Sequence, residues 1–180
     1  MSGKISSIIG NLMPGDGVTE VSVEIDEDDT QFEILGVRDI SSKENSNLFT
    51  QFSIHTQEVN NDDRYIGNLG LGYRFLNAGQ SMMFGVNSFY DRDISEDHSR
   101  ISFGLEAKSS ILDFTLNKYQ KTTNMLAVNS TEEQALSGLD YNISSQVPYM
   151  PWTIFNFQGY RFENEKAAQD TKGRVYSLEM

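Results

Sequence analysis

The sequence predicts an all-β fold, an antiparallel up-and-down β-barrel of the outer-membrane type, preceded by a short N-terminal helix. Three observations predict it: apolar and polar residues alternate from Val18 onward, clusters of turn residues separate the alternating segments, and glycines recur at polar positions. We therefore expect a short amphipathic segment over 1–17 and a β-barrel domain over 18–180, which need not be complete.

The expected helix is based on a helical period at the N-terminus. Apolar residues spaced three and four apart would form one face of a short helix; they are Ile5, Ile8, Ile9, Leu12 and Met13. Pro14 and Gly15 would end it. The residues leave open whether such a helix packs at the terminus, acts as a plug or cap, or attaches to a partner. Its pattern is not that of a secretory signal, because polar residues and Gly10 interrupt the apolar run.

The period of two is clearest over 65–75. One side of that segment would carry Tyr65, Leu69, Leu71, Tyr73 and Phe75, and the other Asn68, Gly70, Gly72 and Arg74. The same alternation runs through 82–91, 101–108, 112–117, 139–143 and 155–158. Successive segments start about 12–18 residues apart, which is long for a small sandwich and suits a membrane barrel.

Glycine falls repeatedly on the polar side, at Gly70, Gly72, Gly85 and Gly104. The interior of a small barrel is crowded, so glycine there relieves packing and permits strong strand curvature. On the solvated face of a sandwich, repeated glycine would only weaken the strands. The glycines therefore favour a closed sheet.

Composition excludes several classes of protein. Hydrophobic residues make up 38% of the chain and its mean hydropathy is −0.45, with no apolar run long enough for a transmembrane helix. A spanning β-strand needs only about 10 residues, half of them facing lipid, so low hydropathy is compatible with a membrane barrel. The net charge of −12 argues against nucleic-acid binding. The absence of cysteine excludes disulfides and thiolate chemistry.

No residue pattern points to a metal, a cofactor or an enzyme. Four acidic residues and a histidine gather at one turn, which lacks the spacing of a calcium-binding loop and reads as a solvated acidic loop; they are Asp91, Asp93, Glu96, Asp97 and His98. A glycosidase pair formed by Glu106 and Asp113 stays the least favoured hypothesis. We prefer a lumenal ion-pair network that also includes Arg74, Arg100 and Lys108.

Aromatic residues stand near the ends of several expected strands. They are Tyr65, Tyr73, Phe75, Phe89, Tyr90, Tyr119, Trp152 and Tyr160. They could form the interfacial girdles of a membrane barrel, or they could be present simply because aromatic residues favour strands. Both interpretations stay open at this point.

Two stretches carry a family resemblance, residues 68–76 (NLGLGYRFL) and 83–91 (MFGVNSFYD). Shorter matches follow in order at 98–100, 104–106, 116–119, 137–140, 147–152 and 159–160. From Leu48 to the end, and more weakly over 18–40, the chain resembles the translocator β-domain of intimin and invasin, the inverse autotransporters. The resemblance implies a twelve-stranded barrel in the outer membrane of a Gram-negative bacterium, through which a C-terminal passenger reaches the cell surface. The partners it implies are outer-membrane lipid, the passenger polypeptide and the barrel-assembly machinery.

Under this hypothesis polar residues of the alternating strands line the lumen. They are Arg74, Asn87, Asp91, Arg100, Glu106, Lys108, Asp113 and Asn117. The chain ends at Met180, inside an expected strand and short of twelve, so we expect either a fragment or a compact relative. Its nine or ten strands would then close as a smaller barrel, pair between chains as an oligomer, or fold away from lipid. The alternative function is that of a soluble all-β module, such as a virion or surface component.

Overall fold

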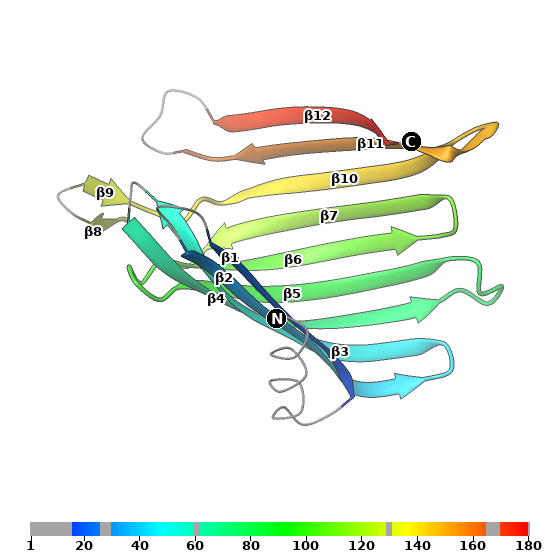
Figure 1. Cartoon of the computed structure of the whole chain (residues 1–180), viewed down its shortest axis with the longest axis horizontal. Coiled ribbons are helices and arrows are strands. Elements are labelled where there is room, and N and C mark those ends of the chain that lie inside the picture. Colours follow the sequence, from blue (N-terminus) through cyan, green and yellow to red (C-terminus); the bar gives the residue numbers. More distant parts are fainter. Residues whose placement is uncertain (1–15, 26–29, 60–61, 129–130, 165–169, 180) are drawn as a thin grey trace.

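The computed structural model describes residues 16–25, 30–59, 62–128, 131–164 and 170–179, and the described strands form one large antiparallel sheet and one small hairpin (Figure 1). The strands of the sheet are β1 (Gly17–Ile25), β2 (Thr30–Lys43), β3 (Ser46–Val59), β4 (Asp62–Leu76), β5 (Met83–Asp93), β6 (Ser99–Lys108), β7 (Leu112–Lys121), β10 (Gly138–Val147), β11 (Met150–Phe162) and β12 (Thr171–Glu179). The hairpin consists of β8 (Leu126–Val128) and β9 (Thr131–Glu133).

Each strand of the sheet pairs with the preceding and following sheet strands in chain order, so the ten strands form an up-and-down meander. The predicted all-β, antiparallel, up-and-down class is confirmed. The predicted N-terminal helix lies outside the described residues, as does the 1–17 segment except for Asp16 and Gly17. Among the described residues, no helix has the length and apolar character needed to cross a membrane.

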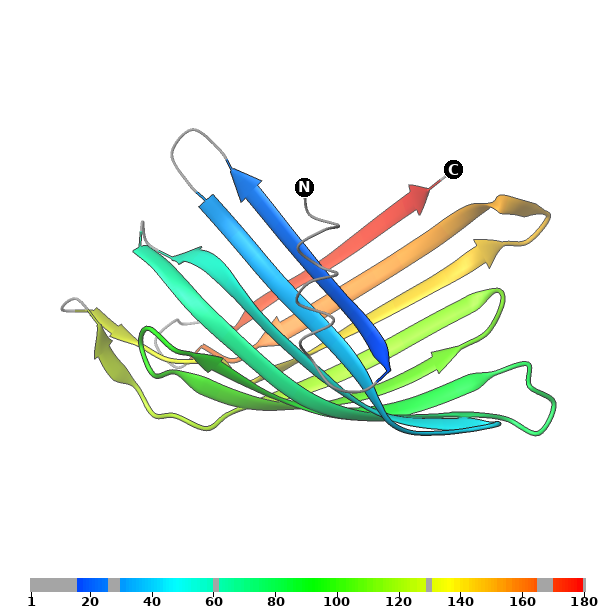
Figure 2. The same ribbon diagram turned by 60° about the horizontal axis from the view of Figure 1, so that its bottom comes forward.

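Closure of the sheet is the part of the fold prediction that the structure does not bear out. The sheet curves into a trough, and β1 and β12 rise as its two separate ends in Figure 2. Each of these strands has one hydrogen-bonded neighbour among the described strands, β2 and β11 respectively. Closure requires strand number, tilt and stagger to agree around the whole sheet. The ten described strands curve, but β1 and β12 are not paired with each other.

The two faces of the trough differ sharply in composition. On the convex face the apolar side chains are open to the surroundings: Leu69, Leu71 and Phe103 are 60%, 56% and 58% exposed. Among the described residues Phe49 is the one buried hydrophobic side chain, whereas the buried polar side chains include Arg64, Ser102 and Glu106. The fold therefore has its apolar side chains outside and its polar side chains inside, the reverse of a water-soluble sandwich.

The connections between strands differ at the two ends of the trough. At one end, which we call the turn end, the chain reverses over 44–45, 77–82, 109–111 and 148–149. At the other, the loop end, the connections include 94–98, 163–170 and the long segment 122–137 that carries the β8–β9 hairpin. β1 starts and β12 finishes at the turn end, since Gly17 is opposite Arg38 and Glu179 is opposite Ile154.

The glycines of the concave face sit beneath large neighbouring side chains. The ring of Phe49 on β3 occupies the space where a Gly72 side chain would be, and the Phe89 ring does the same at Gly70. At Gly85 the neighbour is the Glu106 side chain. The concave face is therefore crowded, as the glycine pattern predicted, because each missing side chain makes room for one from the next strand.

Candidate functional site

The eight residues predicted to line a lumen all lie on the concave face of β4, β5, β6 and β7. The strand register places Asn87 opposite Gly104, which in turn is opposite Asn117. The register also sets Asp91 against Arg100 and Lys108 against Asp113. Arg74 and Glu106 both flank Gly85, one from each adjacent strand. The alternation thus brings these side chains to one surface; that the surface lines an aqueous passage stays a prediction.

The most enclosed charged pair of this group joins Arg74 to Glu106 across the glycine of β5. The guanidinium Nε donates to Oε1 of Glu106 at 2.5 Å, and Nη2 donates to Oε2 at 3.3 Å. The Glu106 side chain is 7% exposed and that of Arg74 is 42% exposed. Arg74 also lies over the Phe49 ring, 4.6 Å from its centroid. Because Gly85 has no side chain, the pair can form directly between β4 and β6.

A second cluster lies nearer the loop end. The Nε of Arg100 donates to Oδ2 of Asp91 at 2.7 Å, and the amide of Asn68 donates to the other carboxylate oxygen. Arg100 stacks over Tyr119, 4.6 Å from the ring centroid. The Tyr119 hydroxyl donates in turn to Asp140 at 2.8 Å. Polar groups of β4, β5, β6, β7 and β10 are thereby linked into one chain of contacts.

The remaining polar contacts of the concave face lie near the turn end and between β7 and β10. Lys108 and Asp113 pair at 2.9 Å, with both side chains more than a third exposed. The amide of Asn117 donates to Asp140 at 2.8 Å. The charges that we expected to form a network thus form three separate ion pairs, and both Glu106 and Asp113 are engaged by basic side chains.

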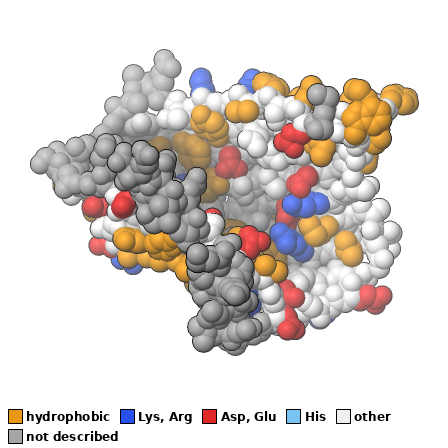
Figure 3. All heavy atoms as spheres, viewed as in Figure 1, with side chains coloured by type: hydrophobic (Ala, Val, Ile, Leu, Met, Phe, Trp, Pro, Cys, Tyr) orange, Lys and Arg blue, Asp and Glu red, His pale blue; other side chains and the backbone are white. Residues whose placement is uncertain are grey.

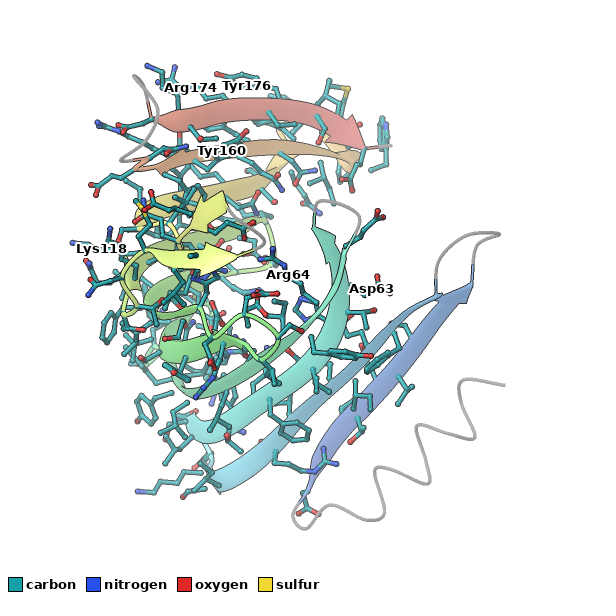
Figure 4. All side chains as sticks on the ribbon, turned by 90° about the vertical axis from the view of Figure 1, so that its left-hand side faces the viewer. Asp63, Arg64, Lys118, Tyr160, Arg174 and Tyr176 are labelled. Carbon is teal, nitrogen blue, oxygen red and sulfur yellow. The ribbon has the colours of Figure 1, made fainter. Side chains whose placement is uncertain are left out.

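A triad at the loop end was not predicted from the sequence. Arg64 on β4 lies 2.8 Å from a carboxylate oxygen of Glu133 on β9 and 3.4 Å from Asp93 on β5. All three side chains are largely buried. Figure 4 shows Arg64 on the concave side of the sheet, where its contact with Glu133 joins the β8–β9 hairpin to β4. Arg64 and Arg74 are an even number of residues apart on β4, so the alternation places both side chains on the concave face. Nothing in the sequence indicates Glu133 as the partner of Arg64.

The acidic turn after β5 is stabilised by local contacts. Oδ1 of Asp93 accepts hydrogen bonds from the backbone N–H groups of Ser95 and Glu96, at 3.0 and 3.1 Å. Arg92 pairs with Asp97 at 2.6 Å. Within the described part of the chain, no group of three or more metal-ligating side chains is found.

The aromatic residues considered for interfacial girdles divide between the two faces. The convex face carries Tyr65, Tyr73, Phe75 and Tyr90, all more than 40% exposed. The girdle interpretation is wrong for three others. Phe89 covers Gly70, Tyr160 covers Gly173, and Tyr119 bonds to Asp140, so all three lie on the concave face.

The concave face encloses a hollow of about 390 Å³. Polar side chains from six strands, β2 to β7, line much of it, among them Glu33, Gln51, Asn68, Asp91, Arg100 and Tyr119. Figure 3 looks into this face and shows acidic and basic side chains close together within it. The site is thus an extended polar surface whose groups bond mainly to one another.

Comparison with known proteins bears on what this surface is for. A family model described as the inverse autotransporter β-domain matches residues 4–180. A putative attaching and effacing protein homolog of Escherichia coli K12 is 30% identical over 142 residues, which cover 75% of this chain and 46% of the relative. The inverse autotransporter adhesin YeeJ of the same strain is 31% identical over 75% of this chain and 6% of its own length. Invasin of Yersinia enterocolitica is 28% identical over 72% of this chain and 15% of its own length.

The fold has a counterpart among solved structures. A chain from a study of the in-meso crystallization of membrane proteins superposes with a TM-score of 0.67 and 17% identity, covering 92% of this chain and 66% of that chain. The present chain spans less than half the length of each of the three relatives above. With a family model that matches nearly every residue, the chain belongs to the inverse autotransporter β-domain family.

Proposed function

We propose that this chain forms the wall of a β-domain that anchors a larger protein in the outer membrane of a Gram-negative bacterium and guides a passenger polypeptide to the cell surface. The observation that carries the proposal is the sidedness of the sheet. Its convex face exposes apolar side chains, and its concave face holds buried or paired polar ones. Lipid on one side and water on the other is the environment that makes this arrangement stable.

The dimensions of the strands agree with a membrane location. A tilted strand needs about 9–11 residues to cross the hydrocarbon region, and the ten sheet strands are 9 to 15 residues long. Every backbone N–H and C=O group inside hydrocarbon must also have a partner. We therefore infer that β1 and β12 are paired in the membrane, through further strands of the larger protein or through another copy, after insertion by the barrel-assembly machinery.

The orientation follows from the connections. Membrane barrels have short turns on the periplasmic side and longer loops outside the cell. By this rule the loop end faces outward, with the 122–137 segment and its hairpin at the cell surface. The turn end, where β1 starts and β12 finishes, then faces the periplasm.

A polar wall whose groups bond to one another suits a passing polypeptide. The passenger brings its own backbone hydrogen-bonding groups and remains hydrated beside such a surface. The cations of Arg74, Arg100 and Lys108 already have carboxylate partners on the wall. The surface therefore has few unpaired cations with which to hold a particular passenger sequence.

Site-directed labelling tests the two environments directly, because the chain has no cysteine of its own. Single cysteines at Gln51 and Thr115 would lie on the concave face, and single cysteines at Leu71 and Phe103 on the convex face. We expect a membrane-impermeant maleimide to label the two concave positions in proteoliposomes and to leave the two convex positions unlabelled. In the unfolded chain all four should react equally, which provides the control.

Two results would contradict the proposal. One is equal labelling of Leu71→Cys and Gln51→Cys in proteoliposomes. The other is a purified chain that is monodisperse in buffer without detergent, because a face with Leu69 60% exposed should then be covered by a protein partner instead of lipid. That outcome would support a soluble all-β module.

A further inference from the structure

Basic side chains gather on the convex face at the loop end of β7, β11 and β12. In one row across the sheet, Lys118 is opposite Leu139, Leu139 is opposite Arg161, and Arg161 is opposite Lys172. Arg174 lies two residues further along β12 on the same side, opposite Gly159. Figure 4 shows Lys118 and Arg174 projecting away from the hollow.

Three of these four cations have no acidic partner among the described residues. Arg161 pairs with Asp170 at 2.7 Å. No ion pair or side-chain hydrogen bond is found for Lys118, Lys172 or Arg174, and all three side chains are exposed. We call these three residues the basic group.

The rest of the convex face does not repeat this pattern. At the loop end of β3 and β4 the convex positions are the acidic residues Glu58 and Asp63, which are opposite each other. On β5, Arg92 is paired with Asp97. In a chain whose net charge is −12, the unpartnered positive charge of the convex loop end is concentrated on the β7–β12 side.

An aromatic cluster adjoins the basic group on the side of the turn end. The rings of Tyr141 and Phe157 lie 5.4 Å apart, and Phe157 stacks on Tyr176 at 4.8 Å with an interplanar angle of 15°. Arg174 is about 7 Å along the strand from Tyr176. The cations therefore stand at the border between the apolar band and the loops, a level at which Lys and Arg stems cover apolar surface while their charges reach outward.

We propose that the basic group binds the phosphate groups of a phosphorylated glycolipid headgroup in the outer leaflet of the membrane. The inference rests on the proposed function, since it needs the convex face in lipid and the loop end outward. Guanidinium and ammonium groups bind phosphate by charge-assisted hydrogen bonds. Lys118 and Lys172 are three strand spacings apart, about 14 Å, so one headgroup with two phosphates can contact both sides of the group.

The test uses the full chain in a zwitterionic detergent, titrated with diphosphorylated lipid A or with lipid A from which both phosphates have been removed, and followed by native mass spectrometry. We expect the phosphorylated form to bind at least tenfold more tightly. Lys172→Gln with Arg174→Gln should weaken that binding about 30-fold, given the usual contribution of a cation near an anionic membrane surface. The control Lys43→Gln with Arg92→Gln removes the same charge elsewhere and should change the affinity less than twofold.

Four results would overturn the inference. They are equal binding of the dephosphorylated glycolipid, an unchanged affinity in the Lys172/Arg174 variant, an equal loss in the control, and displacement of the lipid by an equal concentration of inorganic phosphate. A change in the protein's mass by light scattering in the Lys172/Arg174 variant would also overturn it, since the group would then contact a second copy. If the chain needs detergent to stay monodisperse but binds both forms of lipid A equally, only this inference fails. If the chain is monodisperse without detergent, the proposed function fails as well.

Discussion

The Arg74–Glu106 pair gives the most direct measure of what the concave polar wall contributes to stability. Glu106→Gln keeps the size and shape of the side chain but removes its charge. Hydrogen bonds to charged groups contribute about 1.5–3 kcal/mol to stability. The Glu106 side chain is 7% exposed but that of Arg74 is 42% exposed, so water screens part of the interaction. We therefore expect a loss of about 1–2 kcal/mol in the free energy of unfolding.

Urea unfolding of the refolded protein in detergent measures this loss. The single tryptophan, Trp152, provides a fluorescence signal. With a slope of about 1–3 kcal/mol per molar urea, the midpoint should fall by roughly 0.3–2 M. A double-mutant cycle with Arg74→Gln isolates the pair, and its coupling energy should be about 1 kcal/mol or more.

Asp113→Asn provides the matched control. Lys108 and Asp113 form a pair of similar length, 2.9 Å, but their side chains are 38% and 40% exposed. Exposed pairs contribute about 0–1 kcal/mol, so this variant should lose less than half as much as Glu106→Gln. If the two variants lose the same stability, or if the Arg74–Glu106 coupling energy is near zero, burial over Gly85 does not strengthen the pair and our reasoning is wrong.

Two further perturbations test the packing of the concave face and the position of the hairpin. Gly72→Val would occupy the space of the Phe49 ring, and this overpacking should lower the free energy of unfolding by about 1–3 kcal/mol. Gly67→Val is the control, because the nearest side-chain atom lies 3.4 Å away, and it should lower the free energy of unfolding little. Urea unfolding measures both variants. Arg64→Gln removes the contacts with both Glu133 and Asp93. Because the Arg64 and Asp93 side chains are only 7% and 9% exposed, this variant should lose at least as much stability as Glu106→Gln, and the rate of proteolysis within the β8–β9 hairpin should rise several-fold. A cleavage rate that rises no more than in Glu106→Gln would show that the hairpin is held by other contacts.

The assignment of residues to faces could be predicted from the sequence because the backbone fixes it. Successive side chains of a strand point to opposite faces, so one apolar position such as Leu71 determines the face of Gly70, Gly72 and Arg74. The same rule indicates the concave face for Phe89, which has the parity of Asn87 and Asp91. The girdle interpretation of Phe89 gave more weight to its aromatic character than to its parity.

Closure and the hairpin contact depend on information that a local pattern does not contain. Whether β1 meets β12 depends on the tilt and stagger accumulated over ten strands. Arg64 and Glu133 are 69 positions apart in the chain, and Glu133 belongs to a strand of three residues, which is too short to show a period. Arg38 is a related case. The alternation places it on the same, convex face as Ile34, where an exposed side chain would be expected. It is buried, because its guanidinium donates to the carbonyl of Val18 on β1.

The glycines connect the local alternation, which assigns residues to faces, with the contacts between residues that are far apart in the chain. Gly85 allows Arg74 and Glu106 to meet across β5, and Gly72 makes room for the Phe49 ring over which Arg74 lies. Replacing either glycine would move a neighbour that holds a charge in place, so packing and electrostatics on this wall are not independent. Under the proposed function, an unpaired cation on the concave face would attract acidic segments of the passenger. The glycines that permit the curved sheet would then also help to keep the wall free of such attraction. In this wall the small residues therefore contribute to the electrostatic character of the surface as well as to its shape.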